Sequence, residues 1–167
     1  MSTAPPSGPP APVVRPATRA DADDLLALRV LMFEAMGTDA AALADPAWRV
    51  AARDWFVDAV DAAGVLLVVV EVGGRVVAGA VGEVTALIPG PGCPNGSVGL
   101  VSNVATLPEH RGQGLAAACT DALLAWFTER TDVTRVDLFA TEAGARIYST
   151  RGFVTGTFPA MRRPVPR

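Results

Sequence analysis

The 167-residue sequence contains no lysine, because all 14 of its basic side chains are arginines. A Walker A loop needs a lysine that reaches the phosphates, and a pyridoxal or aldolase-type Schiff base needs a lysine amine, so both chemistries are excluded. The 17 acidic residues give a formal charge of -3, and the arginines are scattered along the chain without forming a basic stripe. We therefore expect no nucleic-acid partner.

Cysteine and histidine are also scarce, with only Cys93, Cys119 and His110 present. Two cysteines are too few for a disulfide framework, and together with one histidine they make no cluster of metal ligands. We therefore expect no bound metal. Cys119 lies in an alanine-rich helical stretch, where we expect a small buried hydrophobe and not a nucleophile.

Long apolar runs are missing as well. Half of the residues are apolar, yet no run approaches the roughly 18 to 20 residues that a membrane span needs, so no membrane association is expected. The first dozen residues hold five prolines and lack a basic stretch followed by an apolar core, unlike a secretory signal. We expect residues 1–12 to be a disordered tail and residues 13–167 to form one domain of a soluble, cytoplasmic protein.

Hydrophobic periodicity predicts an alternation of helices and strands. Asp45 and Pro46 are typical of a helix start, and strand, helix and strand over residues 98–140 have the spacing of a βαβ unit with parallel strands. In chain order we expect a strand over residues 13–15, two helices over 21–36 and 45–62, and a hairpin of strands 65–72 and 75–87 joined by a Gly-Gly turn. A strand over 98–107, a long helix over 112–130, a strand over 133–140, a short helix over 142–151 and one or two terminal strands over 153–163 follow.

The clearest chemical signal lies in residues 108–117, where a strand passes into a helix. Gly112 and Gly114 let backbone amides approach a ligand, and the first N–H groups of the helix and its dipole face the same point. This arrangement predicts an anion site, with a pyrophosphate as the natural occupant.

Two other interpretations of these glycines remain open. Gly112-x-Gly114-x-x-Ala117 also fits a dinucleotide-binding pattern, with Asp137 near the distance expected for a ribose-binding acid. However, Asp137 falls inside the next strand, and the 30 residues after it are too few to complete a doubly wound sheet. The glycines alone are also consistent with a simple tight connection.

Two short motifs carry a family resemblance. Residues 111–116, R-G-Q-G-L-A, resemble the [RQ]-x-x-G-x-[GA] signature of the GNAT superfamily of acyl-CoA N-acyltransferases. Residues 148–153, Y-S-T-R-G-F, resemble the family's second mark, Y-x-x-x-G-F, and residues 138–148 resemble actinobacterial members. The resemblance covers about residues 13–163. It implies an α/β fold with a mixed, mostly antiparallel sheet, whose two central parallel strands splay apart, and with flanking helices.

The resemblance also implies that acetyl-CoA is the co-substrate. Backbone amides of residues 111–116 would bind the CoA pyrophosphate, and the backbone of residues 104–106 would pair with the pantetheine arm like an extra strand. Thr141 stands where the family often has an asparagine, and Gly144 where it often has an alanine; the threonine can still hydrogen-bond. The cofactor-binding residues expected in this way are Val104, Ala105, Thr106, Arg111, Gly112, Gln113, Gly114, Leu115, Ala116 and Thr141.

The implied activity is direct transfer of acetyl from acetyl-CoA to a primary amine of a small molecule or peptide, without a covalent enzyme intermediate. Tyr148 corresponds to the family's general acid, which protonates the departing thiolate; a merely packed aromatic is the alternative. Many relatives carry a carboxylate on the fourth strand, but residues 98–107 contain none. We therefore take Glu83, on the neighbouring strand, as the candidate base, with Asn103 or Ser102 orienting a water.

Family habit also makes a homodimer plausible. The missing strand carboxylate and Thr141 leave a second class of function open, that of a CoA-binding sensor or partner module without turnover. A dinucleotide-dependent oxidoreductase is the third class of function that remains open.

Overall fold

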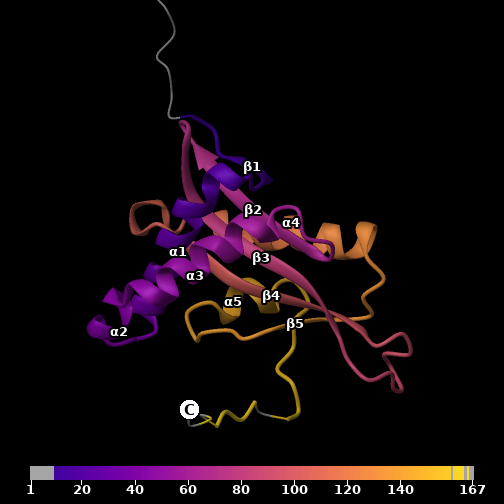
Figure 1. Ribbon diagram of the computed structural model, residues 1–167. Helices are drawn as coiled ribbons and strands as arrows, with labels where there is room; N and C mark the ends of the chain where they lie inside the picture. The colour runs from indigo at the N-terminus through magenta and orange to yellow at the C-terminus, as the bar shows by residue number, and fades with distance from the viewer. Residues whose placement is uncertain (1–9, 159, 164, 166–167) are drawn as a thin grey trace, which may run out of the picture.

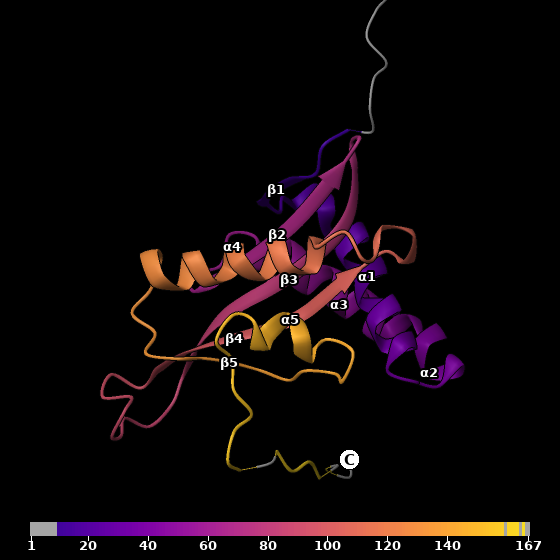
Figure 2. The ribbon, with the colours of Figure 1, turned by 180° about the vertical axis from the view of Figure 1, so that it is seen from behind.

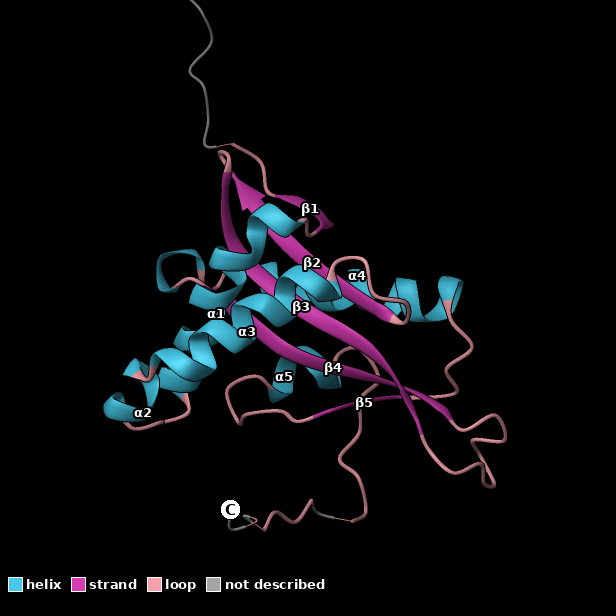
Figure 3. Cartoon of the chain, viewed as in Figure 1, coloured by secondary structure: helices cyan, strands magenta, loops and turns pink. Residues whose placement is uncertain are grey.

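The computed structural model describes residues 10–158, 160–163 and 165, so most of the predicted tail, residues 1–9, lies outside the described residues. Figure 1 shows the arrangement of the elements, and Figure 3 separates helices from strands. Short 3-10 turns occur at Arg19–Asp21 and Pro108–His110. The strands and α-helices are, in chain order, β1 (Val13–Pro16), α1 (Ala22–Ala35), α2 (Ala40–Ala44), α3 (Pro46–Ala59), β2 (Val65–Val72), β3 (Arg75–Ala86), β4 (Ser97–Thr106), α4 (Leu115–Arg130), β5 (Val136–Leu138) and α5 (Ala145–Ser149).

The five strands form one sheet in the order β1-β2-β3-β4-β5. Every neighbouring pair is antiparallel except β4 and β5, which are parallel. The parallel pairing ends at Val101 with Leu138, although β4 continues to Thr106, so the two strands part beyond this point. The predicted mixed, mostly antiparallel α/β sheet with parallel strands that part is thus confirmed, although among the described residues the parallel pair lies at the edge of the sheet and not at its centre.

Helices cover both faces of this sheet. Side chains alternate along β2, so Leu67 and Val69 pack on one face and Val68 and Val70 on the other. Helices α1 and α3 bury the first face and lie in front of the sheet in Figure 1. Helix α4 buries the second face and crosses in front of the sheet in Figure 2, which is viewed from behind.

Glycine in the strands lets α4 lie close to the sheet. A Cβ built on Gly99 of β4 would lie 2.7 Å from Cε1 of Phe127, and a Cβ on Gly82 of β3 would lie 2.9 Å from Cδ2 of Leu123. Both distances are too short for a real contact, so the helix reaches this depth only because these side chains are absent. The close packing fixes the second half of α4 against β3 and the start of β4.

Several predicted elements differ from the structure. The sequence prediction missed α2, and it made β5 too long, because only residues 136–138 pair with β4. The predicted terminal strands over residues 153–163 are wrong: among the described residues of this segment none is extended in a ladder, and Val154 and Phe158 are 88% and 90% exposed. Without a further strand beside it, β5 is paired on one side only, which limits its length.

Cys119 lies on the face of α4 that packs against the sheet and is fully buried there. This burial raises the pKa of its thiol to about 12. The prediction of a small buried hydrophobe is confirmed, since such a thiol carries almost no thiolate at neutral pH. Among the residues described, no helix combines the length and apolar content that crossing a membrane requires.

Candidate functional site

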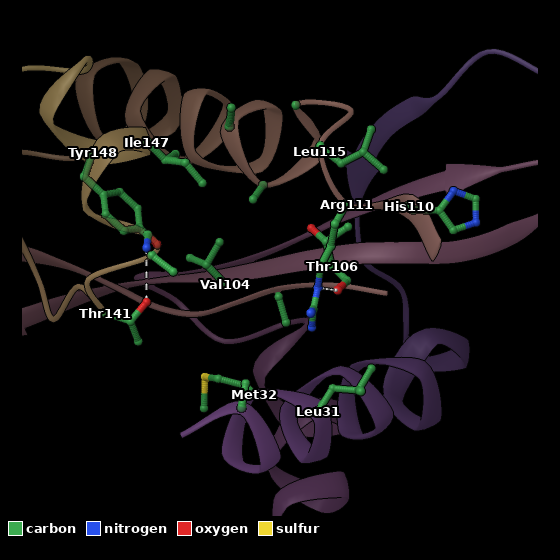
Figure 4. A pocket seen from close by; sticks show the side chains of 18 of the residues that line it. Leu31, Met32, Val104, Thr106, His110, Arg111, Leu115, Thr141, Ile147 and Tyr148 are labelled. Carbon is green, nitrogen blue, oxygen red and sulfur yellow. Dashed lines mark hydrogen bonds between the residues drawn. The ribbon is translucent and has the colours of Figure 1, made fainter. Parts of the chain in front are cut away.

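A cleft of about 480 Å³ opens where the end of β4 meets the start of α4. Figure 4 shows Leu31 and Met32 of α1 on one side of it and Ile147 and Tyr148 of α5 on the other, with Val104 between them. The structure brings all of the predicted cofactor-binding residues except Gln113 to its walls, namely Val104, Ala105, Thr106, Arg111, Gly112, Gly114, Leu115, Ala116 and Thr141.

The turn into α4 is built by two left-handed glycines. Gly112 has a φ of 75° and Gly114 a φ of 78°, a conformation that costs other residues roughly 1–2 kcal/mol. A Cβ on either glycine would meet no protein atom within 4 Å, so the space above the turn is open. Helix α4 begins at Leu115, and its first backbone N–H groups have no partner inside the helix. With the positive end of the helix dipole, these groups suit an anion.

The end of β4 offers a free edge and a distorted backbone. Beyond Val101 the strand has no partner on the side of β5, and the register against β3 shifts between Gly79 and Val81. Opposite this shift Asn103 adopts a φ of 55°, a left-handed conformation that asparagine tolerates better than most residues. The strand therefore carries a β-bulge at the point where it borders the cleft.

Groups for hydrogen bonding lie at the outer end of this edge. The hydroxyl of Thr106 is buried and has no hydrogen-bond partner. The carbonyl oxygen of Thr106 accepts a hydrogen bond from Nε of Arg111 at 3.3 Å, so this arginine side chain lies against the predicted pantetheine edge.

Tyr148 lies at the opposite end of the cleft from His110 (Figure 4). The tyrosine is 9% exposed, its ring packs edge to face against Phe153 at 6.0 Å, and burial raises the pKa of its hydroxyl. A Cβ on Gly144 would approach the Tyr148 ring to 3.3 Å, so glycine leaves room for the ring. The hydroxyl of Thr141 accepts a hydrogen bond from the Gly144 amide at 3.2 Å and thus fixes the turn before α5.

The two other predicted catalytic residues line a different cavity. Glu83 and Asn103 border a space of about 370 Å³ on the side of the sheet that carries α1 and α3. The structure therefore does not place Glu83 beside Tyr148. The two cavities nevertheless lie close together, because Arg29 and Met32, about one turn apart on the same face of α1, line one cavity each.

Arg29 also lines this second cavity, and the sequence prediction did not single it out. The sequence does contain a signal for a polar site at this position. Leu25, Leu28 and Met32 stand at helical spacing on the face of α1 that points to the protein, and Arg29 occupies a position of the same stripe. A charged residue at such a position is a reason to look for a buried polar site.

Comparison with known proteins agrees with this geometry. The model of the acetyltransferase (GNAT) family matches residues 27–153, and the chain belongs to this family. A search of curated proteins found no match. A GCN5-related N-acetyltransferase from Ralstonia eutropha is 29% identical to this chain and superposes with a TM-score of 0.81 over 93% of this chain and 99% of that one.

Two further structures share the fold at lower identity. A predicted acetyltransferase from Clostridium acetobutylicum, solved with acetyl-CoA, is 20% identical, with a TM-score of 0.80 over 92% of this chain and 96% of that one. An aminoglycoside N-acetyltransferase solved in complex with CoA is 15% identical, with a TM-score of 0.73 over 96% and 99%.

The chain is accordingly an acyl-CoA-dependent N-acetyltransferase. The family assignment excludes the dinucleotide interpretation of the glycine turn. The sheet agrees, because it contains one parallel pair and not a doubly wound parallel arrangement, and Asp137 lies within β5.

Proposed function

We propose that this protein acetylates a primary amine of a small molecule or peptide by direct transfer from acetyl-CoA, within one domain formed by residues 13–167. One observation carries the proposal: the two sequence motifs, far apart in the chain, form two walls of a single cleft. Residues 111–116 border one end and Tyr148 the other, and the free edge of β4 runs between them.

The residues present fit CoA. Left-handed Gly112 and Gly114 keep side chains away from the amides at the start of α4, which suits a diphosphate. The unpaired edge of β4 over residues 104–106 suits the amide groups of a pantetheine arm, which can add like a strand. The unpartnered Thr106 hydroxyl provides one more donor or acceptor at this edge. The structure from Clostridium acetobutylicum, which was solved with acetyl-CoA, supports this assignment.

Acetyl-CoA supplies an acetyl group activated as a thioester. In the transfer an N–C bond forms between amine and acetyl, the C–S bond breaks, and the amine loses a proton while the sulfur gains one. Tyr148 holds the proton for the sulfur: its raised pKa keeps the hydroxyl protonated at neutral pH. Because a thiol titrates near 8.5 and the phenol higher, full proton transfer is uphill, and the hydroxyl acts mainly by hydrogen-bonding the developing thiolate.

Glu83 is the base in this proposal, and Asn103 orients an intervening water. Both line the cavity that lies close to the cleft at the β4 bulge. An ammonium group entering through this cavity meets the carboxylate before it reaches the thioester. The neutral amine then attacks the thioester carbonyl from the side of this cavity, and no residue of the protein has to become acylated.

Binding and thiol release test the proposal together. We expect calorimetry to show acetyl-CoA binding, thiol release to depend on an added amine, and mass spectrometry to show no acylated protein during turnover. Replacing Glu83→Gln is expected to lower kcat/KM about 100-fold at neutral pH. Glu129→Gln, on the exposed face of α4, is the matched control. Binding without thiol release across a broad amine panel would instead favour a CoA sensor.

A further inference from the structure

The second cavity contains one positive and one negative side chain, and half of its lining residues are apolar. Arg29 of α1 and Glu83 of β3 supply the charges, and the lining from α3 includes Trp55 and Phe56. Phe56 is 2% exposed and lies at the bottom of the wall, while Trp55 is 41% exposed. The cavity is therefore suited to a small molecule that has both charged and apolar parts.

Arg29 lacks the partner that a partly buried arginine usually has. Among the described residues no carboxylate lies within 4 Å of it, whereas Arg15, on β1, pairs with both Asp21 and Glu71. Its Nη1 donates one hydrogen bond, to Oδ1 of Asn103 at 2.9 Å. Burial lowers the pKa of Arg29 and the nearby Glu83 charge raises it, but a guanidinium stays protonated at neutral pH. Most of its five N–H groups are thus available to a ligand.

Stacking holds this guanidinium in place. Cζ of Arg29 lies 4.8 Å from the centroid of the Phe33 ring, one turn further along α1. Such a cation–π contact limits the motion of the side chain and keeps its planar fork oriented. A preorganised fork is the geometry that binds a carboxylate through two parallel hydrogen bonds.

The amide of Asn103 provides independent evidence for a ligand oxygen. The residue is 6% exposed, and its Nδ2 is buried without any hydrogen-bond partner. The orientation of the Asn103 amide is fixed, because a guanidinium can only donate hydrogen bonds and the amide oxygen must therefore face Arg29. The NH₂ group therefore points elsewhere with both N–H groups unsatisfied, which is unfavourable in a protein interior. Because Nδ2 itself is buried, an acceptor oxygen in the cavity that Asn103 lines satisfies it once the side chain turns toward the cavity.

The charges select between kinds of anion. A carboxylate at Arg29 together with an ammonium group at Glu83 leaves the filled cavity electrically neutral. A phosphate dianion at Arg29 would leave excess negative charge close to Glu83, which is unfavourable away from bulk water. A carboxylate and an ammonium on one small molecule therefore match this cavity better than a phosphorylated amine does.

The position of the cavity suits the amine of such a molecule for transfer. Asn103 and Val104 follow one another at the β4 bulge and line the cavity and the cleft respectively, so both spaces border this part of the strand. Arg29 and Met32 are also three residues apart on one face of α1, and they line the cavity and the cleft respectively. An amine near Glu83 is thus close to the place proposed for the thioester.

We propose that the second cavity is the acceptor site and that the acceptor is an amino acid with a free α-amino group and an apolar side chain. Arg29 binds its carboxylate, Asn103 donates a hydrogen bond to one of the carboxylate oxygens, and Glu83 receives the ammonium group. The apolar side chain packs against Trp55 and Phe56. This inference rests on the proposed acetyltransferase function and names its substrate class.

A matched series of acceptors tests it: leucine, leucinamide, isopentylamine and O-phosphoethanolamine, each with acetyl-CoA. We expect kcat/KM for leucine to exceed that for the other three by at least about 10-fold. Arg29→Gln should lower kcat/KM for leucine by about 10- to 100-fold and leave the values for leucinamide and isopentylamine nearly unchanged. Arg29→Lys, which keeps the charge but not the fork, should give an intermediate loss. Arg53→Gln, at an exposed arginine of α3, is the control and should change nothing.

Each outcome has a defined meaning. Equal or better use of leucinamide, isopentylamine or O-phosphoethanolamine by the unaltered protein overturns the inference while the acetyltransferase function stands, as does an equal loss on all acceptors in Arg29→Gln. If no amine of the broad panel releases thiol, the proposed function fails, and calorimetric titration of leucine into the CoA-saturated protein then tests the acceptor site by itself. Leucine binding that is lost in Arg29→Gln supports the acceptor site, and absence of leucine binding overturns it. An unchanged Tm and CoA affinity show that the variant is folded.

Discussion

Replacing Gly112 by aspartate is expected to weaken CoA binding about a hundredfold while the protein stays folded. The glycine has a φ of 75°, and a Cβ there would meet no protein atom within 4 Å, so the change causes no clash. The left-handed backbone adds roughly 1–2 kcal/mol of strain, which a domain with a typical stability of roughly 5–15 kcal/mol tolerates. A carboxylate about 5 Å from one diphosphate charge is repelled by about 3 kcal/mol at an effective dielectric constant of about 20, or about a hundredfold in Kd.

Calorimetric titration with CoA measures this effect, and two variants separate its causes. Gly112→Ala carries the backbone strain without the charge and should weaken binding much less. Gly74→Asp, in the turn between β2 and β3, has the same charge, a similar φ of 82° and equally open surroundings, but lies away from the cleft. It should leave Kd unchanged. The repulsion should also shrink as salt is raised. A folded Gly112→Asp protein with unaltered affinity for CoA would refute the assignment of the diphosphate to this turn.

Three further predictions concern turnover and stability. Tyr148→Phe should lower kcat about 100-fold in the thiol-release assay with little effect on CoA affinity, because only the proton donor is lost. Gly99→Ala should reduce the free energy of unfolding by about 1–3 kcal/mol in urea, because the new Cβ would lie 2.7 Å from Phe127. Asp21, whose pKa the Arg15 hydrogen bonds lower from 3.8 to about 2, should contribute stability at neutral pH. About 2 kcal/mol of this should be lost as the pH falls to 2, because the unfolded state takes up the proton first.

Each of these has an outcome that contradicts it. Unchanged turnover in Tyr148→Phe would make the tyrosine a packed aromatic only. An unaltered urea midpoint in Gly99→Ala would mean that α4 does not lie as close to β4 as described. For the acid-dependent stability, Asp21→Asn is the comparison: it should be less stable at neutral pH and should lose less stability on acidification, and an identical pH profile would contradict the ion-pair assignment.

The sequence predicted the parts of the fold that local chemistry controls. Asp45 and Pro46 were expected to start a helix, and α3 begins at Pro46 with the Asp45 carboxylate accepting the Ala47 amide hydrogen bond at 2.9 Å. Helix α2 was missed even though Asp39 caps it in the same way, because a helix of five residues has too short a hydrophobic period to be recognised. The length of strand β5 and the strand content of the terminal segment were overestimated. The length of a strand depends on pairing with a neighbouring strand, which local sequence does not reveal.

The candidate site was predicted where motifs mark it and was incomplete where only tertiary packing forms it. Gly112, Gly114 and Tyr148 converge on the expected cleft, because the glycine turn and the β4–α4–β5 connection follow from local pattern. The separation of Glu83 from this cleft depends on which face of β3 the side chain occupies. The lack of a carboxylate partner for Arg29 among the described residues depends on side chains from four elements. Neither follows from spacing in one chain.

A crystal structure of this protein with CoA tests the central claim most directly. We expect the diphosphate to accept hydrogen bonds from backbone amides of residues 111–116 and the pantetheine arm to run along residues 104–106, with its sulfur near the Tyr148 hydroxyl. CoA bound elsewhere, or a diphosphate held only by side chains away from the start of α4, would contradict the claim.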